Sequence, residues 1–126
     1  MDPEAITRGL DKVPKRTCRA GDARSTPKGT PLEGTYKETY WYSVLVPTEE
    51  GASEIWGLED RLAFLARDLS PRAEFISTLR ASGGRAELFI GLYGDRNFGF
   101  ELPPQTVATL AAIGLALSFD IYPGPA

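Results

Sequence analysis

The residues best suited to form a site are a carboxylate and several aromatic side chains that predicted strands place on one face. Asp120 and Tyr122 alternate with apolar residues near the end of the chain, so their side chains point to the same side of a strand. Tyr93 ends a second alternating run, and Trp41 lies in a third. Aromatic rings around a carboxylate can bind a small ligand, because the rings provide contact area and the charge fixes orientation. We therefore expect a binding site where these strands meet.

A basic segment precedes these strands. Between residues 12 and 28, six basic side chains accompany a single acid, Asp22. The six are Lys12, Lys15, Arg16, Arg19, Arg24 and Lys28. If the segment covers the aromatic face, Arg19 or Arg24 could attract an anion or pair with Asp120. The alternative is a solvated loop that Asp120 merely holds in place, with Trp41 in the core. The candidate binding residues are therefore Arg19, Asp22, Arg24, Trp41, Tyr93, Asp120 and Tyr122.

The residue types offer little for catalysis. The sequence contains no histidine, which removes the usual general base, the commonest metal ligand and the Ser-His-Asp and Cys-His arrangements. Cys18 lies beside Arg19, but a lone thiol is more often a bystander than a nucleophile. The adjacent acids Glu49-Glu50 and Glu59-Asp60 are better explained as a turn and a solvated helix face than as an acid/base pair. We predict no catalytic residue, no metal and no cofactor.

Length and composition indicate a single globular domain over residues 1–126. No apolar run approaches the roughly 20 residues that would span a bilayer, and the acidic start of the chain is unlike a signal peptide. We therefore expect a cytoplasmic protein without membrane contact. The net charge of −3 divides unevenly, because residues 1–40 hold eight Lys/Arg and six Asp/Glu, whereas residues 41–126 hold six and eleven.

The second half of the chain shows the clearest local pattern. Alternating apolar residues predict a strand over 86–93, and Gly94-Asp95-Arg96-Asn97 predicts a turn into an antiparallel strand over 98–102. Pro103-Pro104 then predicts the start of a helix that ends at Gly114, and alternation resumes in a strand over 115–122. These elements should form the frame of the fold.

The first half contains a short helix from Asp2-Pro3, a long basic loop over 15–37 and an aromatic strand over 39–46. The following helix carries one apolar stripe, made by Ile55, Leu58, Leu62, Leu65 and Leu69. Ser70-Pro71 begins a further helical segment that continues to Gly83-Gly84. The predicted fold class is α+β: a single two-layer sandwich of a mixed or antiparallel sheet with helices mainly on one face.

Three stretches of the chain carry a family resemblance. They are DPEAITRGLDKVPKRTCRAGD, the aromatic strand with Trp41, and LAAIGLALSFDIYP. Together they resemble the DUF4279 family of small bacterial proteins over most of the chain. The matching positions are Ile6, Thr7, Pro14, Gly21, Asp22, Trp41, Gly114, Asp120 and Tyr122. The resemblance implies a fold and no activity, because the function of this family is unknown.

Members of that family usually have a strand before the DPExIT helix, whereas this chain begins at the helix. Without that strand, one sheet edge would hold unpaired backbone groups. The strands predicted over 39–46, 86–93 and 115–122 carry few of the lysines and prolines that discourage edge pairing. We therefore expect a homodimer that covers a sheet edge, with the loop over 15–37 as the alternative cover.

The function that these observations favour is a non-catalytic binding or interaction domain that binds, and could neutralise, a protein partner. One alternative is a small histidine-free enzyme that uses Asp120 with Arg19 or Arg24. Another is weak nucleic-acid binding through the basic segment, which the acidic isoelectric point of about 5.0 disfavours.

Overall fold

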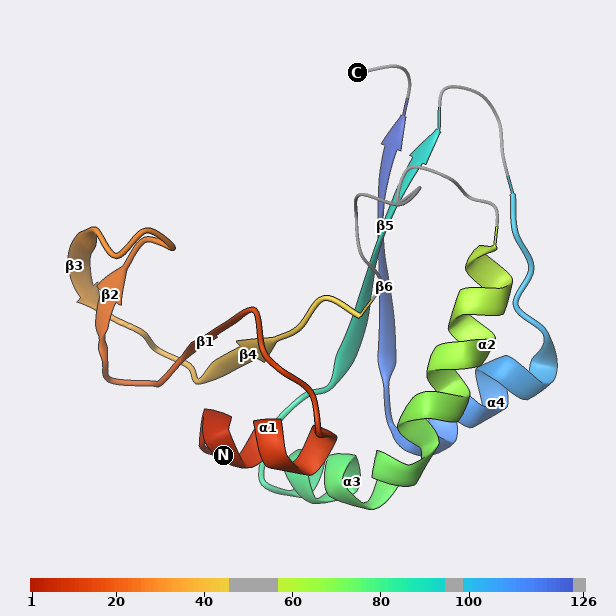
Figure 1. The fold of residues 1–126 in the computed structure, drawn as a ribbon, viewed down its shortest axis with the longest axis horizontal. Coiled ribbons are helices and arrows are strands. Elements are labelled where there is room, and N and C mark those ends of the chain that lie inside the picture. The colour runs from red at the N-terminus through yellow and green to blue at the C-terminus, as the bar shows by residue number, and fades with distance from the viewer. Residues whose placement is uncertain (46–56, 95–98, 124–126) are drawn as a thin grey trace. The chain divides into compact units, whose positions relative to one another are not determined.

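The computed structural model describes residues 1–45, 57–94 and 99–123, and the chain divides into two compact units, residues 1–45 (unit 1) and 46–126 (unit 2). Helices occur together with antiparallel and parallel strand pairs, which confirms the α+β class (Figure 1). Within the described ranges, no helix has both the length and the apolarity to cross a membrane. The single domain and the cytoplasmic location expected from the sequence stay predictions.

Unit 1 begins with the predicted short helix, α1 (Pro3–Leu10). The Asp2 carboxylate accepts the Glu4 backbone N–H at 3.0 Å, and Pro3 occupies the first turn, where its missing N–H costs nothing. Asp11 has a φ of 53° and ends the helix in the left-handed conformation. The predicted start of this helix at Asp2-Pro3 is therefore confirmed.

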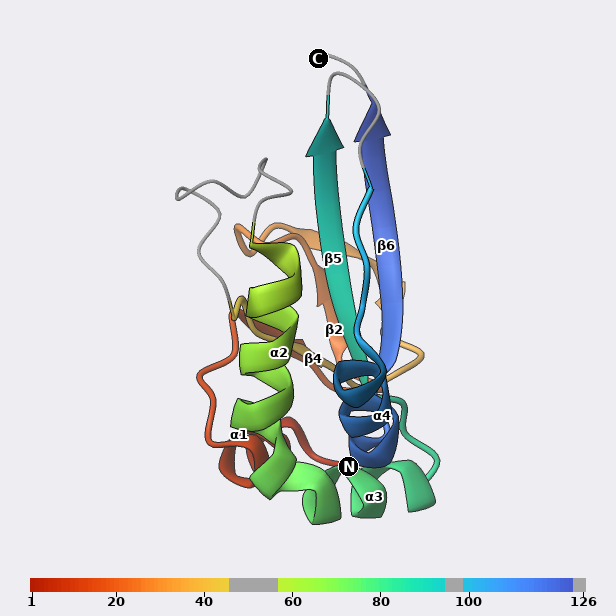
Figure 2. The same cartoon turned by 90° about the vertical axis from the view of Figure 1, so that its right-hand side faces the viewer.

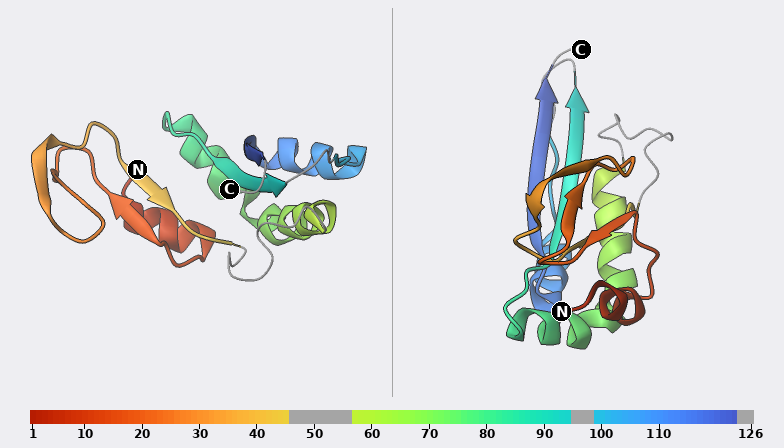
Figure 3. Two further views of the ribbon diagram at one scale, coloured as in Figure 1. Left: turned by 90° about the horizontal axis from the view of Figure 1, so that it is seen from above. Right: turned by 90° about the vertical axis from the view of Figure 1, so that its left-hand side faces the viewer.

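The prediction of a loop over residues 15–37 is wrong, because this segment contains three strands. β1 (Arg16–Cys18) pairs antiparallel with β4 (Tyr40–Tyr42), and β2 (Ala23–Ser25) pairs antiparallel with β3 (Pro31–Thr35). Figure 3 shows the β2–β3 pair beyond the β1–β4 pair, on the side away from α1. All of β3 is exposed, so apolar alternation, the signal on which strand prediction depends, is missing here.

The signal that could have predicted the β2–β3 hairpin is its turn. Thr26-Pro27-Lys28-Gly29 has proline at the second position and glycine at the fourth, as type I turns prefer. The Gly29 N–H donates to the Thr26 carbonyl at 2.8 Å, and the Thr30 N–H donates to the Thr26 hydroxyl at 3.0 Å.

Unit 2 contains the predicted apolar helix, α2 (Leu58–Leu69), which continues through a 3₁₀ turn, η1 (Ser70–Arg72), into α3 (Ala73–Ala81). The stripe is confirmed, since its described members, Leu58, Leu62, Leu65 and Leu69, are all buried. Ile55 lies outside the described residues. The further helical segment begins at Ser70 as predicted, but Ser70 has helical φ and ψ, so the chain stays helical from α2 into the turn.

The last strands are β5 (Glu87–Gly94) and β6 (Ala116–Pro123), which pair in parallel with Leu88 opposite Leu117. A parallel pair requires a crossover, and α4 (Pro104–Ile113) provides it. Gly114 ends α4 as predicted, with a φ of 94° that favours glycine. In Figure 2, as in Figure 1, α2 and α4 lie on the same side of this strand pair.

The predicted antiparallel strand over 98–102 is wrong for its described part. Residues 99–103 are not a strand, because the Glu101 N–H donates to the Glu59 carboxylate on α2 at 2.7 Å instead of to a neighbouring strand. The ring of Phe100 lies 5.5 Å from that of Phe119 on β6. Most of the predicted turn, residues 95–97, lies outside the described residues.

The core of unit 2 predicts a large stability effect for one α2 residue. Truncation of buried Leu62 to alanine should leave a cavity and lower the free energy of unfolding by about 2–5 kcal/mol. Phe64→Ala on the same helix is the matched control, because Phe64 is 58% exposed and its loss should cost less. Chemical denaturation followed by circular dichroism measures both. Equal losses for the two variants would show that the stripe is not the core.

Candidate functional site

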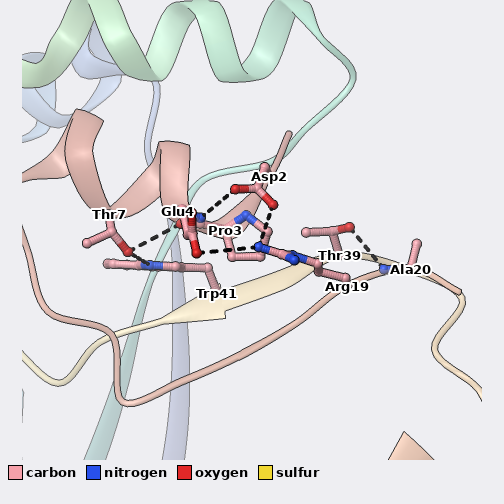
Figure 4. Close-up of polar contacts among 8 residues, drawn as sticks. All are labelled: Asp2, Pro3, Glu4, Thr7, Arg19, Ala20, Thr39 and Trp41. Atoms are coloured by element: carbon pink, nitrogen blue, oxygen red, sulfur yellow. Dashed lines mark hydrogen bonds and ion pairs between the residues drawn. The ribbon is translucent and has the colours of Figure 1, made fainter. Parts of the chain in front are cut away.

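In unit 1, a hydrogen bond between side chains connects α1 to β4. The Trp41 indole N–H donates to the Thr7 hydroxyl at 3.0 Å, and that hydroxyl donates to the Pro3 carbonyl at 3.2 Å (Figure 4). Trp41 is half-buried. The indole N–H of Trp41 is therefore already hydrogen-bonded within unit 1, and the ring packs on the helix side of the β1–β4 pair.

Arg19 connects the end of β1 to the start of α1. Its guanidinium lies 2.9 Å from the Asp2 carboxylate and 3.8 Å from that of Glu4 (Figure 4). The side chains of Arg19 and Asp2 are about half exposed, at 50% and 46%, so water screens the pair and its net contribution is about 0–1 kcal/mol. The pair therefore orients Arg19 and partly compensates its charge, while adding little stability.

A shallow hollow of about 290 Å³ lies between the first turns of α1 and the β1 segment. Its wall combines carboxylates, hydroxyls, a thiol, a guanidinium and two proline rings. The lining residues are Pro3, Glu4, Thr7, Pro14, Thr17, Cys18, Arg19 and Asp22. The Cys18 thiol donates to the Glu38 carbonyl at 3.6 Å. Two of the predicted site residues, Arg19 and Asp22, are among the lining residues.

Other basic side chains of the segment bond to backbone carbonyls of unit 1. Arg16 donates to the Ser25 carbonyl at 2.8 Å and to the Tyr36 hydroxyl at 3.1 Å. Arg24, a predicted site residue, donates to the Glu33 carbonyl at 3.2 Å across the β2–β3 hairpin. These two arginines thus stabilise the strands, which leaves less reason to expect an anion at this segment.

The Tyr36 hydroxyl forms a small cluster with Ser25 and Arg16. It accepts the Ser25 N–H at 3.1 Å and donates to the Ser25 carbonyl at 3.0 Å. The hydrogen bond from the Ser25 backbone, and then the bond and charge of Arg16, lower the pKa of Tyr36 below its ordinary value of 10.0.

The remaining predicted site residues belong to unit 2. In the β5–β6 register, Gly91 is opposite Asp120 and Tyr93 is opposite Tyr122, so these residues lie on one face of the pair as predicted. The Tyr122 hydroxyl donates to the Asp120 carboxylate at 3.1 Å. The side chain of Tyr93 lies outside the described part of the structure.

The structure brings the predicted residues together as two separate groups. Arg19 and Asp22 line the hollow of unit 1, Trp41 bonds to Thr7 in the wall of the same hollow, and Arg24 bonds across the β2–β3 hairpin. Asp120 and Tyr122 share a face in unit 2, so an association of Asp120 with Arg19, Arg24 or Trp41 stays a prediction. Sequence reasoning missed Glu4 and Thr7 as site residues because it treated them only as parts of a short helix.

Comparison with known proteins identifies a family and nothing beyond it. The family model described as "Domain of unknown function (DUF4279)" matches residues 1–124, nearly the whole chain. No curated protein and no solved structure matches.

The bond between Trp41 and Thr7 predicts a specific effect of Thr7→Val. Valine keeps the branched shape but removes the acceptor, so unfolding should become easier by about 1 kcal/mol. The Trp41 indole N–H resonance should shift at the same time. Thr35→Val is the control, since Thr35 is an exposed threonine of β3 whose register partner is Ala23, and it should change neither the stability nor the indole resonance. An unshifted indole resonance in Thr7→Val would contradict the bond.

The lowered pKa of Tyr36 predicts a pH effect with a definite sign. The folded state favours the phenolate more than the unfolded state does, so Tyr36 should add stability as the pH rises through its folded pKa toward 10.0. Well below the folded pKa this contribution should be absent. Ultraviolet titration should show one tyrosine ionising early in the natural chain and not in Tyr36→Phe. Identical curves for the two chains would refute the interpretation.

Proposed function

The chain belongs to the DUF4279 family, a domain of unknown function, and we propose that it is a non-catalytic binding domain whose unit 1 hollow receives a basic side chain of a protein partner. The observation that carries this proposal is the excess of carboxylates at the hollow. Glu4 and Asp22 line it, and the lining cation, Arg19, is paired with Asp2 at 2.9 Å. A basic group would therefore be attracted.

The position of Arg19 supports this choice of ligand charge. Arg19 is held at 2.9 Å from Asp2 and 3.8 Å from Glu4, so its charge is partly neutralised before any ligand arrives. A ligand guanidinium or ammonium group could bind Asp22 and share Glu4 with Arg19. Bidentate binding of a guanidinium by a carboxylate gives geometric as well as electrostatic selectivity.

The size and borders of the hollow favour a side chain of a protein over a larger ligand. Its volume of about 290 Å³ is at the lower end of the roughly 300–1,000 Å³ typical of ligand pockets, so it suits one side chain. Tyr40 is the register partner of Cys18 and is 53% exposed. An exposed tyrosine beside the lining strand provides contact area for a partner and a ring face for a cation.

The enzyme and nucleic-acid hypotheses stay predictions that these contacts do not favour. The two arginines of the enzyme hypothesis also belong to the basic segment of the nucleic-acid hypothesis, and both donate to acceptors within unit 1: Arg19 to Asp2 and Glu4, and Arg24 to the Glu33 carbonyl. A phosphate group would have to displace these acceptors.

The proposal predicts charge-selective binding of an arginine probe. N-acetylarginine amide should shift the backbone amide resonances of residues 17–22 and of the first turn of α1 in a nuclear magnetic resonance titration. N-acetylcitrulline amide has nearly the same shape without the charge, and it should shift them several-fold less at equal concentration. Equal shifts from both probes would contradict a carboxylate-based site.

Matched variants localise the effect. Asp22→Asn should weaken binding of the arginine probe several-fold, because it removes a lining carboxylate. Glu33→Gln removes the same charge from exposed β3, outside the hollow, and should leave the affinity nearly unchanged. If the two variants weaken binding equally, the probe responds to net charge alone and the proposed site is wrong.

A further inference from the structure

Strand β5 has a second edge that is suited to pair with another strand. Among the described residues, β5 and β6 form a sheet of two strands, so each strand pairs along one side within these ranges. We propose that two copies of the chain pair antiparallel through this edge of β5 and form a four-stranded sheet with β6 at both outer sides. The proposal does not depend on the hollow in unit 1.

The residues of the two strands favour β5 over β6 for this contact. β6 carries Asp120 near its centre and ends at Pro123, which cannot donate a backbone hydrogen bond. Pairing of two β6 strands would bring like charges close together, and charge and proline are the usual protection of a strand edge. The run from Leu88 to Gly94 in β5 contains neither a charged residue nor a proline.

Twofold symmetry then limits the register. A twofold axis perpendicular to the sheet relates each face of β5 to the same face of the partner's β5. Two residues that lie opposite each other must then have side chains on the same face, and this holds only if the axis passes beside a single residue of β5. Centring on Ile90, the middle of the apolar run, places Leu88 opposite the partner's Leu92. Leu88 and Leu92 are both buried toward the helices in one copy, and the pairing would extend this apolar layer across the axis.

The other face of β5 is complementary in the same register. Phe89 is 63% exposed, and it would lie opposite the partner's Gly91, which has no side chain to oppose the ring. An aromatic ring that covers a cross-strand glycine is a stabilising arrangement in sheets. Glu87 would lie opposite the partner's Tyr93, and within its own copy it pairs with Arg85 at 2.9 Å. The register therefore brings no like charges together.

Charge substitutions at Phe89 test the contact. Sedimentation at micromolar concentration should show a dimer for the natural chain and monomers for Phe89→Lys and for Phe89→Glu. In the proposed register the two copies of residue 89 are diagonal neighbours at about 7–8 Å, so like charges repel. An equimolar mixture of the two variants should dimerise again, because opposite charges then face each other. Restoration in the mixture also shows that both variants are folded.

Ile121→Lys is the matched control. Ile121 is 59% exposed on β6 of the same sheet, so lysine there should leave the dimer intact. A monomeric natural chain, a dimer that survives Phe89→Lys, or a dimer lost equally in Ile121→Lys would each overturn the proposal.

The salt dependence of dimerisation is a second test of the proposal. Residues 41–126 hold six Lys/Arg and eleven Asp/Glu, so two copies of unit 2 repel each other at long range. A contact made by backbone bonds and apolar side chains should therefore strengthen as sodium chloride screens this repulsion. Dissociation by added salt would mean that ion pairs make the contact, and the β5 proposal would then be wrong.

Discussion

The hydrogen bond from Trp41 to Thr7 is the interaction on which the candidate site depends, because it holds α1 against the strand pair that forms the other wall of the hollow. Unit 1 buries little apolar surface; Ile6 is its buried hydrophobic residue in the core. Hydrogen bonds and ion pairs, rather than a large apolar core, therefore hold its helix and strands in place. Asp2 combines two of them, since one oxygen caps α1 and the other binds Arg19.

In unit 2, by contrast, burial of apolar side chains determines the geometry. Its buried residues are almost all aliphatic, and they lie on the stripe of α2, on α3, on α4 and on one side of β5. The parallel pairing of β5 and β6 requires α4 as a crossover, and the crossover places α4 beside α2 on one face of the pair. Burial on one face leaves exposed residues on the strands themselves, such as Phe89 on β5 and Ile121 on β6.

The sequence predicted the elements whose residues alternate with burial or carry strong caps. α1, α2, α4, β5 and β6 were predicted because an N-cap, an apolar stripe, a terminal glycine or a two-residue period marks each of them. Exposed β3 has no such period. The parallel register was also not predictable from alternation, which is the same in parallel and antiparallel strands. The turn glycines suggested a hairpin, whereas the Glu101 N–H bonds to Glu59 on α2.

The site was less predictable than the fold because the basic segment was interpreted by composition. Six Lys/Arg against one acid suggests an anion site, yet Arg16 and Arg24 bond to carbonyls of neighbouring strands and Arg19 bonds to the acids of α1. The donors of an arginine can satisfy strand and helix ends as well as a ligand. The charge that such a segment offers to a ligand therefore depends on which of its donors are already bonded, and a count of basic residues does not show this.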